Sequence, residues 1–249
     1  MTAPILVCKG LTLRFGGVVA VDRLDLAVEE GEILGIIGPN GAGKTSLLNA
    51  ICQLDPPTDG TVHLHGALLN GKSPEALATL GVARTFQIVK SFGGLTVRQN
   101  AAIGAMFGHR RSSVAAALQK ADEVLDFVGL GHRRHSSVKQ LPLAERKRLE
   151  LARALAMEPR LLLLDEVMAG LNAAAVVPMM RLVQQVRATG MTVMIIEHLV
   201  RAIMGICDRI LVMHMGRRIA LGAPQEIASD PEVVRAYLGH RYVAAAGEG

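Results

Sequence analysis

The glycine-rich segment GPNGAGKT, residues 38–45, restricts the fold of this chain more than any other feature of its sequence. It fits the pattern GxxxxGK followed by Ser or Thr, which is informative when a strand precedes it and a helix follows it. Both flanks are present: the run EILGII, residues 32–37, is typical of a strand buried on both faces, and SLLNAICQL after the loop has helical spacing. The sequence therefore predicts a strand, a phosphate-binding loop and a helix in this order.

The residue types of this loop suit a nucleotide. Glycines let the backbone wrap around a phosphate with its amides facing the anion, and the helix after the loop adds its positive end. We expect Lys44 to act on the β- and γ-phosphates during binding and catalysis, and the Thr45 hydroxyl to bind Mg²⁺. The predicted nucleotide contacts of the loop are Gly38, Pro39, Asn40, Gly41, Ala42, Gly43, Lys44, Thr45 and Ser46.

A second candidate element is the segment LLLLDE, which places Asp165 and Glu166 at the end of an apolar run. In an open parallel sheet the carboxyl ends of the strands face the ligand. We therefore expect Asp165 to hold Mg²⁺, directly or through water. Glu166 is predicted to be the general base that polarises the attacking water.

The rest of the chain alternates strands with helices. Two antiparallel strands are predicted around Gly16-Gly17, and further strands at residues 61–65, 82–86, 161–164 and 192–196. A hairpin is expected over residues 209–221 with its turn at Gly216, and a last helix after Asp230-Pro231. Residues 95–156 have helical spacing and no clear strand, which indicates an inserted helical subdomain. The predicted class is α/β, a P-loop NTPase with a RecA-like parallel core, an antiparallel β-subdomain and this helical insertion.

Composition narrows the possible partners. The 249 residues carry a net charge of +5, which indicates an anionic partner such as a nucleotide, a nucleic acid or a membrane surface. Three cysteines without CxxC spacing argue against a disulfide framework and fit a reducing compartment. No secretory signal is expected at the N-terminus, and no apolar stretch approaches the roughly 20 residues that span a bilayer. A membrane role must therefore come through a partner.

With these motifs in order, the chain resembles the ATP-binding subunits of ABC transporters over about residues 5–239, and residues 240–249 are expected to be a C-terminal tail. The resemblance implies that Phe15 stacks on adenine. It also implies that Gln87, at the end of VARTFQ, reaches Mg²⁺ and the water. His198, at the end of IIEH, matches the switch histidine that contacts the γ-phosphate. AGLN, residues 169–172, is similar to the D-loop, with Asn172 where aspartate is commoner.

The resemblance extends to a narrower group. RTFQ with SFGGLTVRQN, DEVMAGLN and CDRILVMHMGRRIALGAP are similar to the larger ATPase subunit of bacterial branched-chain amino-acid importers. Relatives of that group move urea, short amides or aromatic acids. This resemblance implies integral membrane permease subunits and, indirectly, a periplasmic or extracytoplasmic binding protein. It also implies a second ATPase subunit, either a homologue or a second copy of this chain, in a nucleotide-sandwich dimer. The expected location is the cytoplasmic face of the inner membrane.

One segment departs from the family pattern. Where the family has a signature such as LSGGQ, this chain has LPLAE, residues 141–145. Pro142 has neither a hydroxyl nor an N–H group to offer a phosphate, and Leu143 and Ala144 replace glycines. One interpretation is a weakened composite site. The other is that proline starts the helix, amides from Leu143 onward still face phosphate, and a partner subunit supplies the stronger signature.

Two other functions stay open at this stage. The altered signature would also suit a regulatory ABC subunit with little turnover, although Glu166 and His198 are intact. A soluble ABC ATPase acting on nucleic acid or ribosomes is the third possibility. The basic clusters at residues 109–111, 132–134 and 146–148 are solvated helix faces, a membrane contact or a nucleic-acid contact. Aromatic residues make up only 3% of the chain, so we expect no nucleic-acid partner.

Overall fold

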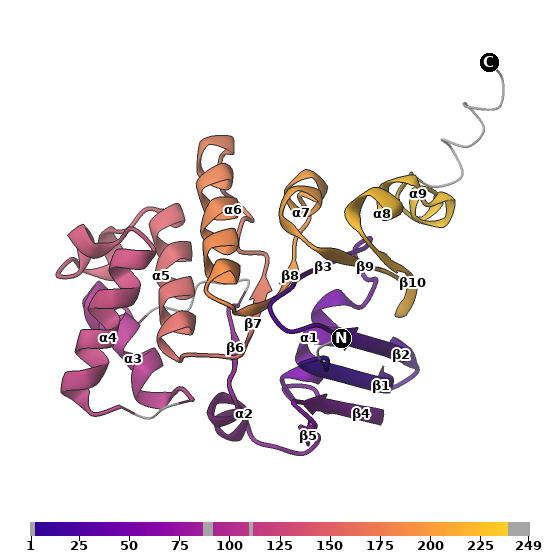
Figure 1. Cartoon of the computed structure of the whole chain (residues 1–249), viewed down its shortest axis with the longest axis horizontal. Coiled ribbons are helices and arrows are strands. Elements are labelled where there is room, and N and C mark those ends of the chain that lie inside the picture. Colours follow the sequence, from indigo (N-terminus) through magenta and orange to yellow (C-terminus); the bar gives the residue numbers. More distant parts are fainter. Residues whose placement is uncertain (1–2, 87–91, 110–111, 239–249) are drawn as a thin grey trace. The chain divides into compact units, whose positions relative to one another are not determined.

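The computed structural model describes residues 3–86, 92–109 and 112–238, in two compact units (Figure 1). Residues 1–71 and 194–249 belong to the first unit, and residues 72–193 to the second. Each unit combines strands with helices, as predicted for an α/β chain. Of the helices in the described ranges, none combines the length and apolarity that crossing a bilayer requires.

An antiparallel sheet forms the N-terminal part of the first unit. Its strands follow the order β2-β1-β4-β5, with β1 Leu6–Phe15, β2 Val18–Val28, β4 Asp59–Leu64 and β5 Ala67–Leu68. β1 pairs with β2 from Leu6 opposite Val28 to Phe15 opposite Val18, across the turn at Gly16. The two antiparallel strands predicted around Gly16-Gly17 are confirmed.

The remaining strands of the first unit follow the order β10-β9-β3-β8. They are β3 Ile33–Ile37, β8 Thr192–Ile196, β9 Arg209–His214 and β10 Arg217–Gly222. The first two residues of β8 are counted with the second unit. β3 and β9 are parallel, whereas β9 and β10 form the predicted hairpin that turns at Met215 and Gly216. The strands predicted at residues 32–37 and 192–196 are thus confirmed.

The helices in the described residues of this unit are α1 Lys44–Ile51, α7 Val200–Ile206, α8 Pro224–Ser229 and α9 Pro231–Leu238. α7 packs closely on β3, because a Cβ atom on Gly35 would lie 2.8 Å from both Cys207 Sγ and Ile203 Cγ2. Every residue of β3 is buried, so the strand that leads into the phosphate loop is fixed by packing.

In the second unit, β6 Val82–Arg84 and β7 Leu161–Asp165 are parallel, with Val82 opposite Leu161. β6 is shorter than the predicted strand at residues 82–86. α2 Pro74–Leu80 precedes it and α6 Ala173–Ala188 follows β7. α2 was not predicted, although Ser73 at its N-cap and Pro74 at its first helical position are standard signals of a helix start.

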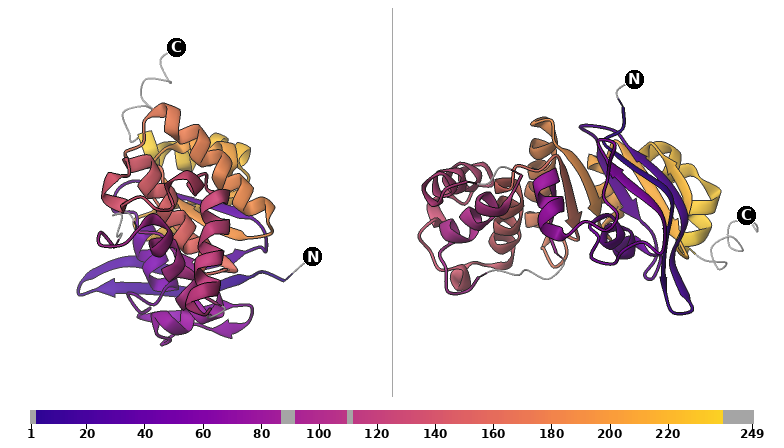
Figure 2. Two further views of the ribbon diagram at one scale, coloured as in Figure 1. Left: turned by 90° about the vertical axis from the view of Figure 1, so that its left-hand side faces the viewer. Right: turned by 90° about the horizontal axis from the view of Figure 1, so that it is seen from below.

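Within the described residues of the predicted helical span 95–156, the α-helices are α3 Val97–Phe107, α4 Val114–Phe127 and α5 Leu143–Ala156. They lie side by side in Figures 1 and 2. Gly104 of α3 meets the backbone of α5 so closely that a Cβ atom there would overlap the carbonyl oxygen of Arg153. Whether this span is a separate subdomain stays a prediction.

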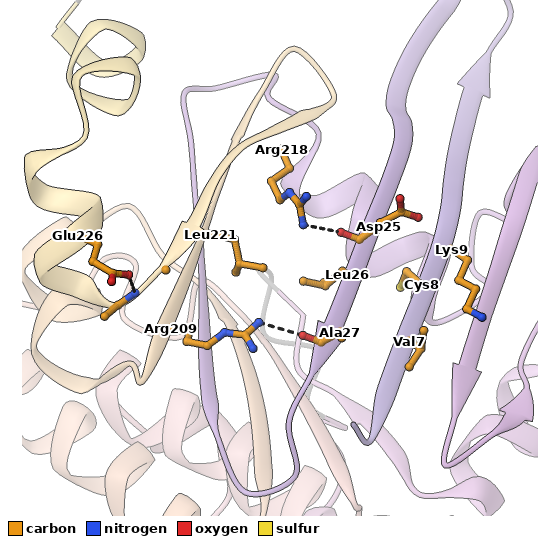
Figure 3. Close-up of a pocket in the computed structure, with 12 residues that line it drawn as sticks. Val7, Cys8, Lys9, Asp25, Leu26, Ala27, Arg209, Arg218, Leu221 and Glu226 are labelled. Carbon is orange, nitrogen blue, oxygen red and sulfur yellow. Dashed lines mark hydrogen bonds between the residues drawn. The ribbon is translucent and has the colours of Figure 1, made fainter. Parts of the chain in front are cut away.

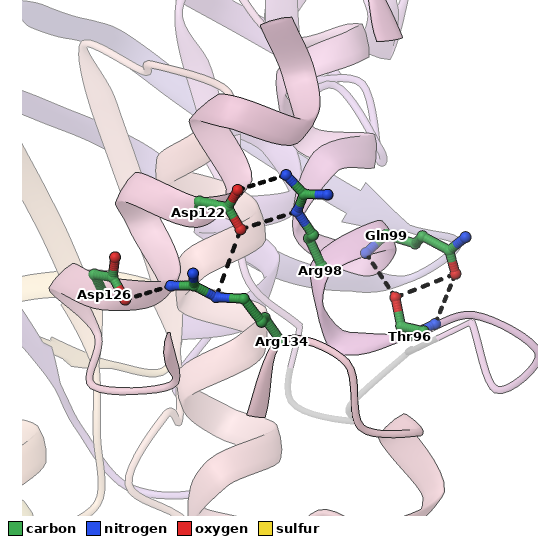
Figure 4. A network of polar contacts seen from close by, with 6 residues as sticks. All are labelled: Thr96, Arg98, Gln99, Asp122, Asp126 and Arg134. Carbon is green, nitrogen blue, oxygen red and sulfur yellow. Dashed lines mark hydrogen bonds and ion pairs between the residues drawn. The ribbon is translucent and has the colours of Figure 1, made fainter. Parts of the chain in front are cut away.

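An ion-pair network connects α3 with α4 and with the segment before α5 (Figure 4). Arg98 donates two hydrogen bonds to Asp122, of 2.9 and 2.5 Å. Arg134 lies 3.6 Å from Asp122 and donates to Asp126 at 2.7 Å. The hydrogen bond from Arg98 holds the pKa of Asp122 below its usual value. At the start of α3, Thr96 and the Gln99 side chain form a reciprocal capping box.

Candidate functional site

The predicted phosphate loop connects β3 to α1. Gly41 and Gly43 have φ angles of 77° and 98°, and Gly43 is the N-cap of α1. A Cβ atom on Gly43 would overlap the carbonyl oxygen of Ala20 in β2, so glycine is required there for space as well as for conformation. The Gly216 amide donates to the carbonyl oxygen of Ala42 at 3.0 Å, which ties the loop to the turn between β9 and β10.

Lys44 is the first residue of α1 and is only 7% exposed. Its Nζ donates to the carbonyl oxygens of Gly38 at 2.8 Å and Pro39 at 2.9 Å. The ammonium is thereby held over the loop. The first turn of α1 contains no acidic residue, so nothing in it offsets the positive end of the helix. This arrangement of a left-handed glycine, a helix start and a held cation suits an anionic ligand.

Asp165 ends β7 in the second unit and is 2% exposed. Its Oδ2 accepts a 2.7 Å hydrogen bond from Arg84 of β6, whose side chain is also buried. The Asp165 amide donates to Thr85 Oγ1 at 3.2 Å. Its Oδ1 is buried and accepts no hydrogen bond within the described part of the chain. A buried carboxylate oxygen without a donor is a suitable ligand for a cation.

Glu166 follows directly and is 8% exposed. Its φ angle of 52° lies in the left-handed region, which costs a residue with a side chain roughly 1–2 kcal/mol. Its carbonyl oxygen accepts hydrogen bonds from Lys147 Nζ at 3.0 Å and from the Ala169 amide at 3.2 Å. Strain of this kind persists only where neighbouring contacts enforce it, and it often occurs at functional sites.

The other predicted site residues fall in different parts of the chain. Phe15 ends β1 and is 49% exposed, and His198 is exposed two residues beyond β8. These two residues and the phosphate loop belong to the first unit, whereas Asp165 and Glu166 belong to the second. Gln87 lies outside the described residues.

The LPLAE segment leads into α5. Pro142 is the N-cap, and its side chain makes no capping hydrogen bond. The helix starts at Leu143, directly after the proline. The Arg146 amide donates to the Pro142 carbonyl oxygen at 3.0 Å, which is the first hydrogen bond of the helix. Glu145 lies 3.1 Å from Arg133 and 3.9 Å from His132.

Two of the basic clusters, at residues 132–134 and 146–148, are not uniformly solvated helix faces, whereas Arg110 and Arg111 of the third cluster lie outside the described residues. Lys147 of the 146–148 cluster is 3% exposed and binds the Glu166 carbonyl oxygen. Arg146 donates to the Leu141 carbonyl oxygen at 2.7 Å. In the 132–134 cluster, Arg133 and Arg134 both pair with carboxylates. The sequence could not separate these cations from solvated ones, because all of them lie in short runs of like charge.

A cavity of about 760 Å³ lies in the first unit between β2 and the β9–β10 hairpin (Figure 3). Arg209 donates a hydrogen bond to the Ala27 carbonyl oxygen at 2.9 Å, and Arg218 donates one to the Asp25 carbonyl oxygen at 3.1 Å. The residues that line this cavity include none of the phosphate loop. We therefore interpret the two arginines as bridges between neighbouring strands of the first unit.

A preformed cation cage is absent from the part of the chain that the structure describes, where no three His, Cys, Asp or Glu side chains are grouped around a common point.

Comparison with known proteins gives two family matches. Residues 21–169 match the family described as "ABC transporter". Residues 217–243 match the family "Branched-chain amino acid ATP-binding cassette transporter". The high-affinity branched-chain amino acid transport ATP-binding protein LivG of Salmonella typhimurium is 37% identical over 96% of this chain and 99% of its own length. BraF of Pseudomonas aeruginosa, with the same description, is 36% identical over the same shares.

Solved structures agree in fold. The ADP conformation of MJ1267, an ATP-binding cassette of an ABC transporter, aligns with a TM-score of 0.85 and 28% identity, over 96% of this chain and all of that one. The dimeric, post-hydrolysis structure of the cassette MJ0796 bound to ADP and Pi aligns with a TM-score of 0.79 and 25% identity, over 88% of this chain and 98% of that one.

Proposed function

The chain belongs to the ABC transporter family of ATP-binding proteins, and we propose that it powers a bacterial importer of branched-chain amino acids or related small polar or amide substrates. ATP hydrolysis is the activity of this family. The substrate class is supported by the match of residues 217–243 and by the names of LivG and BraF. The observation that carries the proposal is the phosphate loop itself, with Lys44 held at the start of α1.

In the proposed site the loop amides and Lys44 bind the β- and γ-phosphates, and Phe15 stacks on adenine. Phe15 is exposed enough to accept a ring on its face. The dipole of α1 and the lysine charge both favour the phosphates, and they stabilise the charge that shifts to the leaving oxygen as the γ-phosphate departs. His198 contacts the γ-phosphate in this proposal.

Thr45, Asp165 and Gln87 would hold Mg²⁺. The buried Oδ1 of Asp165, which accepts no hydrogen bond from a described residue, fits this role. The ion, when bound, neutralises charge on the phosphate oxygens. Arg84 balances the charge of the same carboxylate from the other side, through Oδ2.

Glu166 accepts the proton of the attacking water in this mechanism. It is the residue directly after β7, and its strained backbone is held by hydrogen bonds to its carbonyl oxygen. Partial burial lowers the number of competing waters around the carboxylate. A positioned base of this kind accelerates hydrolysis by about 10² to 10⁴.

The partners follow from the family. ATP-binding relatives work with membrane permeases and as dimers, and a dimeric cassette is among the solved structures that this chain resembles. In our proposal the chain binds permease subunits at the cytoplasmic face of the inner membrane and pairs with a second ATPase. A binding protein outside the membrane delivers the substrate.

The LPLAE segment favours a heterodimer in this proposal. Pro142 provides no hydroxyl, and Leu143 and Ala144 place side chains where the family has glycines. The partner's signature would face the phosphate loop of this chain, so hydrolysis here depends on the partner. The same observation favours a second candidate, a regulatory subunit with little turnover.

One experiment tests the proposal. The full chain, carrying an affinity tag, is isolated gently from native membranes, its partners are identified by mass spectrometry, and ATP hydrolysis and leucine uptake into proteoliposomes are measured. Two polytopic membrane proteins, a second ATPase and steady turnover are expected. An assembly that contains them but shows no turnover supports the regulatory candidate. Ribosomal or DNA-bound partners without a membrane protein would overturn the transporter function.

A further inference from the structure

Lys147 is a buried lysine that contacts the backbone of the proposed general base. It is the fifth residue of α5 and only 3% exposed. Its Nζ donates to the Glu166 carbonyl oxygen at 3.0 Å. Both residues belong to the second unit and are 19 positions apart in the sequence. A buried ammonium needs polar partners, and a hydrogen bond from a charged donor is stronger than one between neutral groups.

The carbonyl oxygen that accepts this hydrogen bond belongs to a residue with an unfavourable backbone. Glu166 has a φ angle of 52°, which an L-amino acid with a side chain adopts only when its surroundings enforce it. Lys147 and the Ala169 amide approach the same oxygen, at 3.0 and 3.2 Å. One donor from α5 and one from the turn after β7 fix the orientation of the peptide after Glu166, and this peptide in turn restricts the direction of the Glu166 side chain.

We propose that Lys147 is a positioning residue that holds the Glu166 backbone in its left-handed conformation and thereby aims the carboxylate at the attacking water. This inference rests on the proposed function, in which Glu166 is the general base. Lys147 acts only through Glu166, so it affects the chemical step and leaves nucleotide binding intact. A lysine that merely fills space between α5 and β7 would affect stability without this selective effect.

The test compares Lys147→Met with wild type in the complex isolated from native membranes through a tag on this chain. Methionine keeps the length of the buried side chain but donates no hydrogen bond. Because displacing a catalytic group by about 1 Å can cost 100-fold, we expect kcat to fall about 10-fold to 100-fold. KM for ATP and the Kd of a fluorescent ATP analogue should change by less than about twofold.

Two further variants complete the comparison. Lys147→Arg keeps a charged donor and should recover most of the kcat that Lys147→Met loses. Lys72→Met makes the same chemical change at an exposed lysine of the same unit and should behave as wild type. If the methionine variant does not fold, as judged by thermal unfolding, Lys147→Gln replaces it, because its shorter, neutral side chain does not reach the carbonyl oxygen. A wild-type kcat in Lys147→Met or Lys147→Gln, or an equal loss of nucleotide affinity, would overturn the proposal.

Glu166→Gln separates this proposal from the proposed function. If Glu166→Gln hydrolyses ATP at the wild-type rate, the general base is wrong. If Glu166→Gln stops turnover while Lys147→Met leaves kcat unchanged, the general base stands and only the positioning role fails. In the double variant, Lys147→Met should leave the residual rate of Glu166→Gln unchanged, since residues that act as a unit are not additive. A further 10-fold loss there would contradict the proposal.

Discussion

The Nζ atom of Lys44 donates a 2.8 Å hydrogen bond to the carbonyl oxygen of Gly38, so that a residue near the end of the phosphate loop contacts its first residue. A second donation, to Pro39 at 2.9 Å, holds the charge at the same place. The lysine is therefore ordered within the loop by groups of the loop itself. This preorganisation lowers the entropic cost of using the charge to bind a phosphate.

Lys44→Ala should lower ATP affinity by at least about 10-fold, because it removes a positive charge from the phosphates in a buried setting. Isothermal titration of the full chain with ATP measures the effect. Lys72→Met, which removes an exposed lysine elsewhere, is the control and should bind ATP normally. Unchanged affinity in Lys44→Ala would contradict the assignment of the loop.

Glu166→Gln should bind ATP as wild type does and lose about 10² to 10⁴ of the hydrolysis rate, since glutamine cannot accept the proton of water. Single-turnover hydrolysis in the isolated complex gives the rate, and a fluorescent ATP analogue gives the affinity. Glu232→Gln changes an exposed glutamate in α9 and should keep the wild-type rate. Wild-type turnover by Glu166→Gln would exclude it as the base.

Gly43→Ala should be more destabilising than Gly41→Ala, although both glycines have positive φ angles. A methyl group on Gly43 overlaps the Ala20 carbonyl oxygen, whereas a Cβ atom on Gly41 meets nothing within 4 Å. We expect a loss of about 1 kcal/mol in the free energy of unfolding for Gly41→Ala and more than about 2 kcal/mol for Gly43→Ala. Urea denaturation followed by circular dichroism compares them. Equal losses would mean that the contact with Ala20 contributes nothing.

The three cysteines should resist thiol reagents in the native chain. All three are buried, and burial raises the pKa of the Cys8 thiol to about 12 and raises the pKa of the Cys207 thiol as well. Since the thiolate is the reactive form, a disulfide reagent at about pH 8 should react slowly with the native protein. In concentrated guanidinium chloride all three thiols should react quickly. Rapid native labelling of Cys8 or Cys207 would show that its surroundings open readily.

Asp122→Asn should destabilise the helical part of the second unit at neutral pH, and less so in acid. Arg98 lowers the pKa of Asp122 in the folded state. The ion pair therefore contributes to the free energy of unfolding above the ordinary carboxyl pKa of about 4, and this contribution is lost as the pH falls through the lower pKa of the folded state. Thermal unfolding of wild type and variant between neutral pH and about pH 3 measures this difference. Asp126→Asn, at the exposed end of the network, should destabilise the chain less than Asp122→Asn at neutral pH. If the difference in stability between wild type and Asp122→Asn did not change with pH, the ion pair would not contribute to the free energy of unfolding.

The strand, turn and helix around residues 38–45 could be predicted because their determinants are local. The apolar run before residue 38, the glycines and the helical spacing after it lie within about twenty consecutive residues, and each has a direct conformational meaning. β3, α1 and the left-handed Gly41 and Gly43 follow this pattern. The hairpin around Gly216 was predictable for the same reason.

The contacts of Arg84 and Lys147 could not be predicted in this way. Periodicity places Lys147 in a helix, but in RKR it has the appearance of a solvated charge. Its burial depends on the packing of α5 near the end of β7, and its partner is a backbone oxygen, which leaves no trace in the sequence. Arg84 likewise meets Asp165 only because β6 and β7 are parallel neighbours.

The sequence by itself determined the local chemistry of this protein: where most of the strands and helices form, where the chain turns at Gly16 and Gly216, and which residue types can bind phosphate or activate water. The tertiary structure alone decided which charges are buried and what they contact, including the Arg84–Asp165 pair and the hydrogen bond from Lys147 to Glu166. The physical reason is that backbone conformation depends mainly on neighbouring residues. The free energy of a buried charge depends on groups that packing brings together from distant positions in the chain.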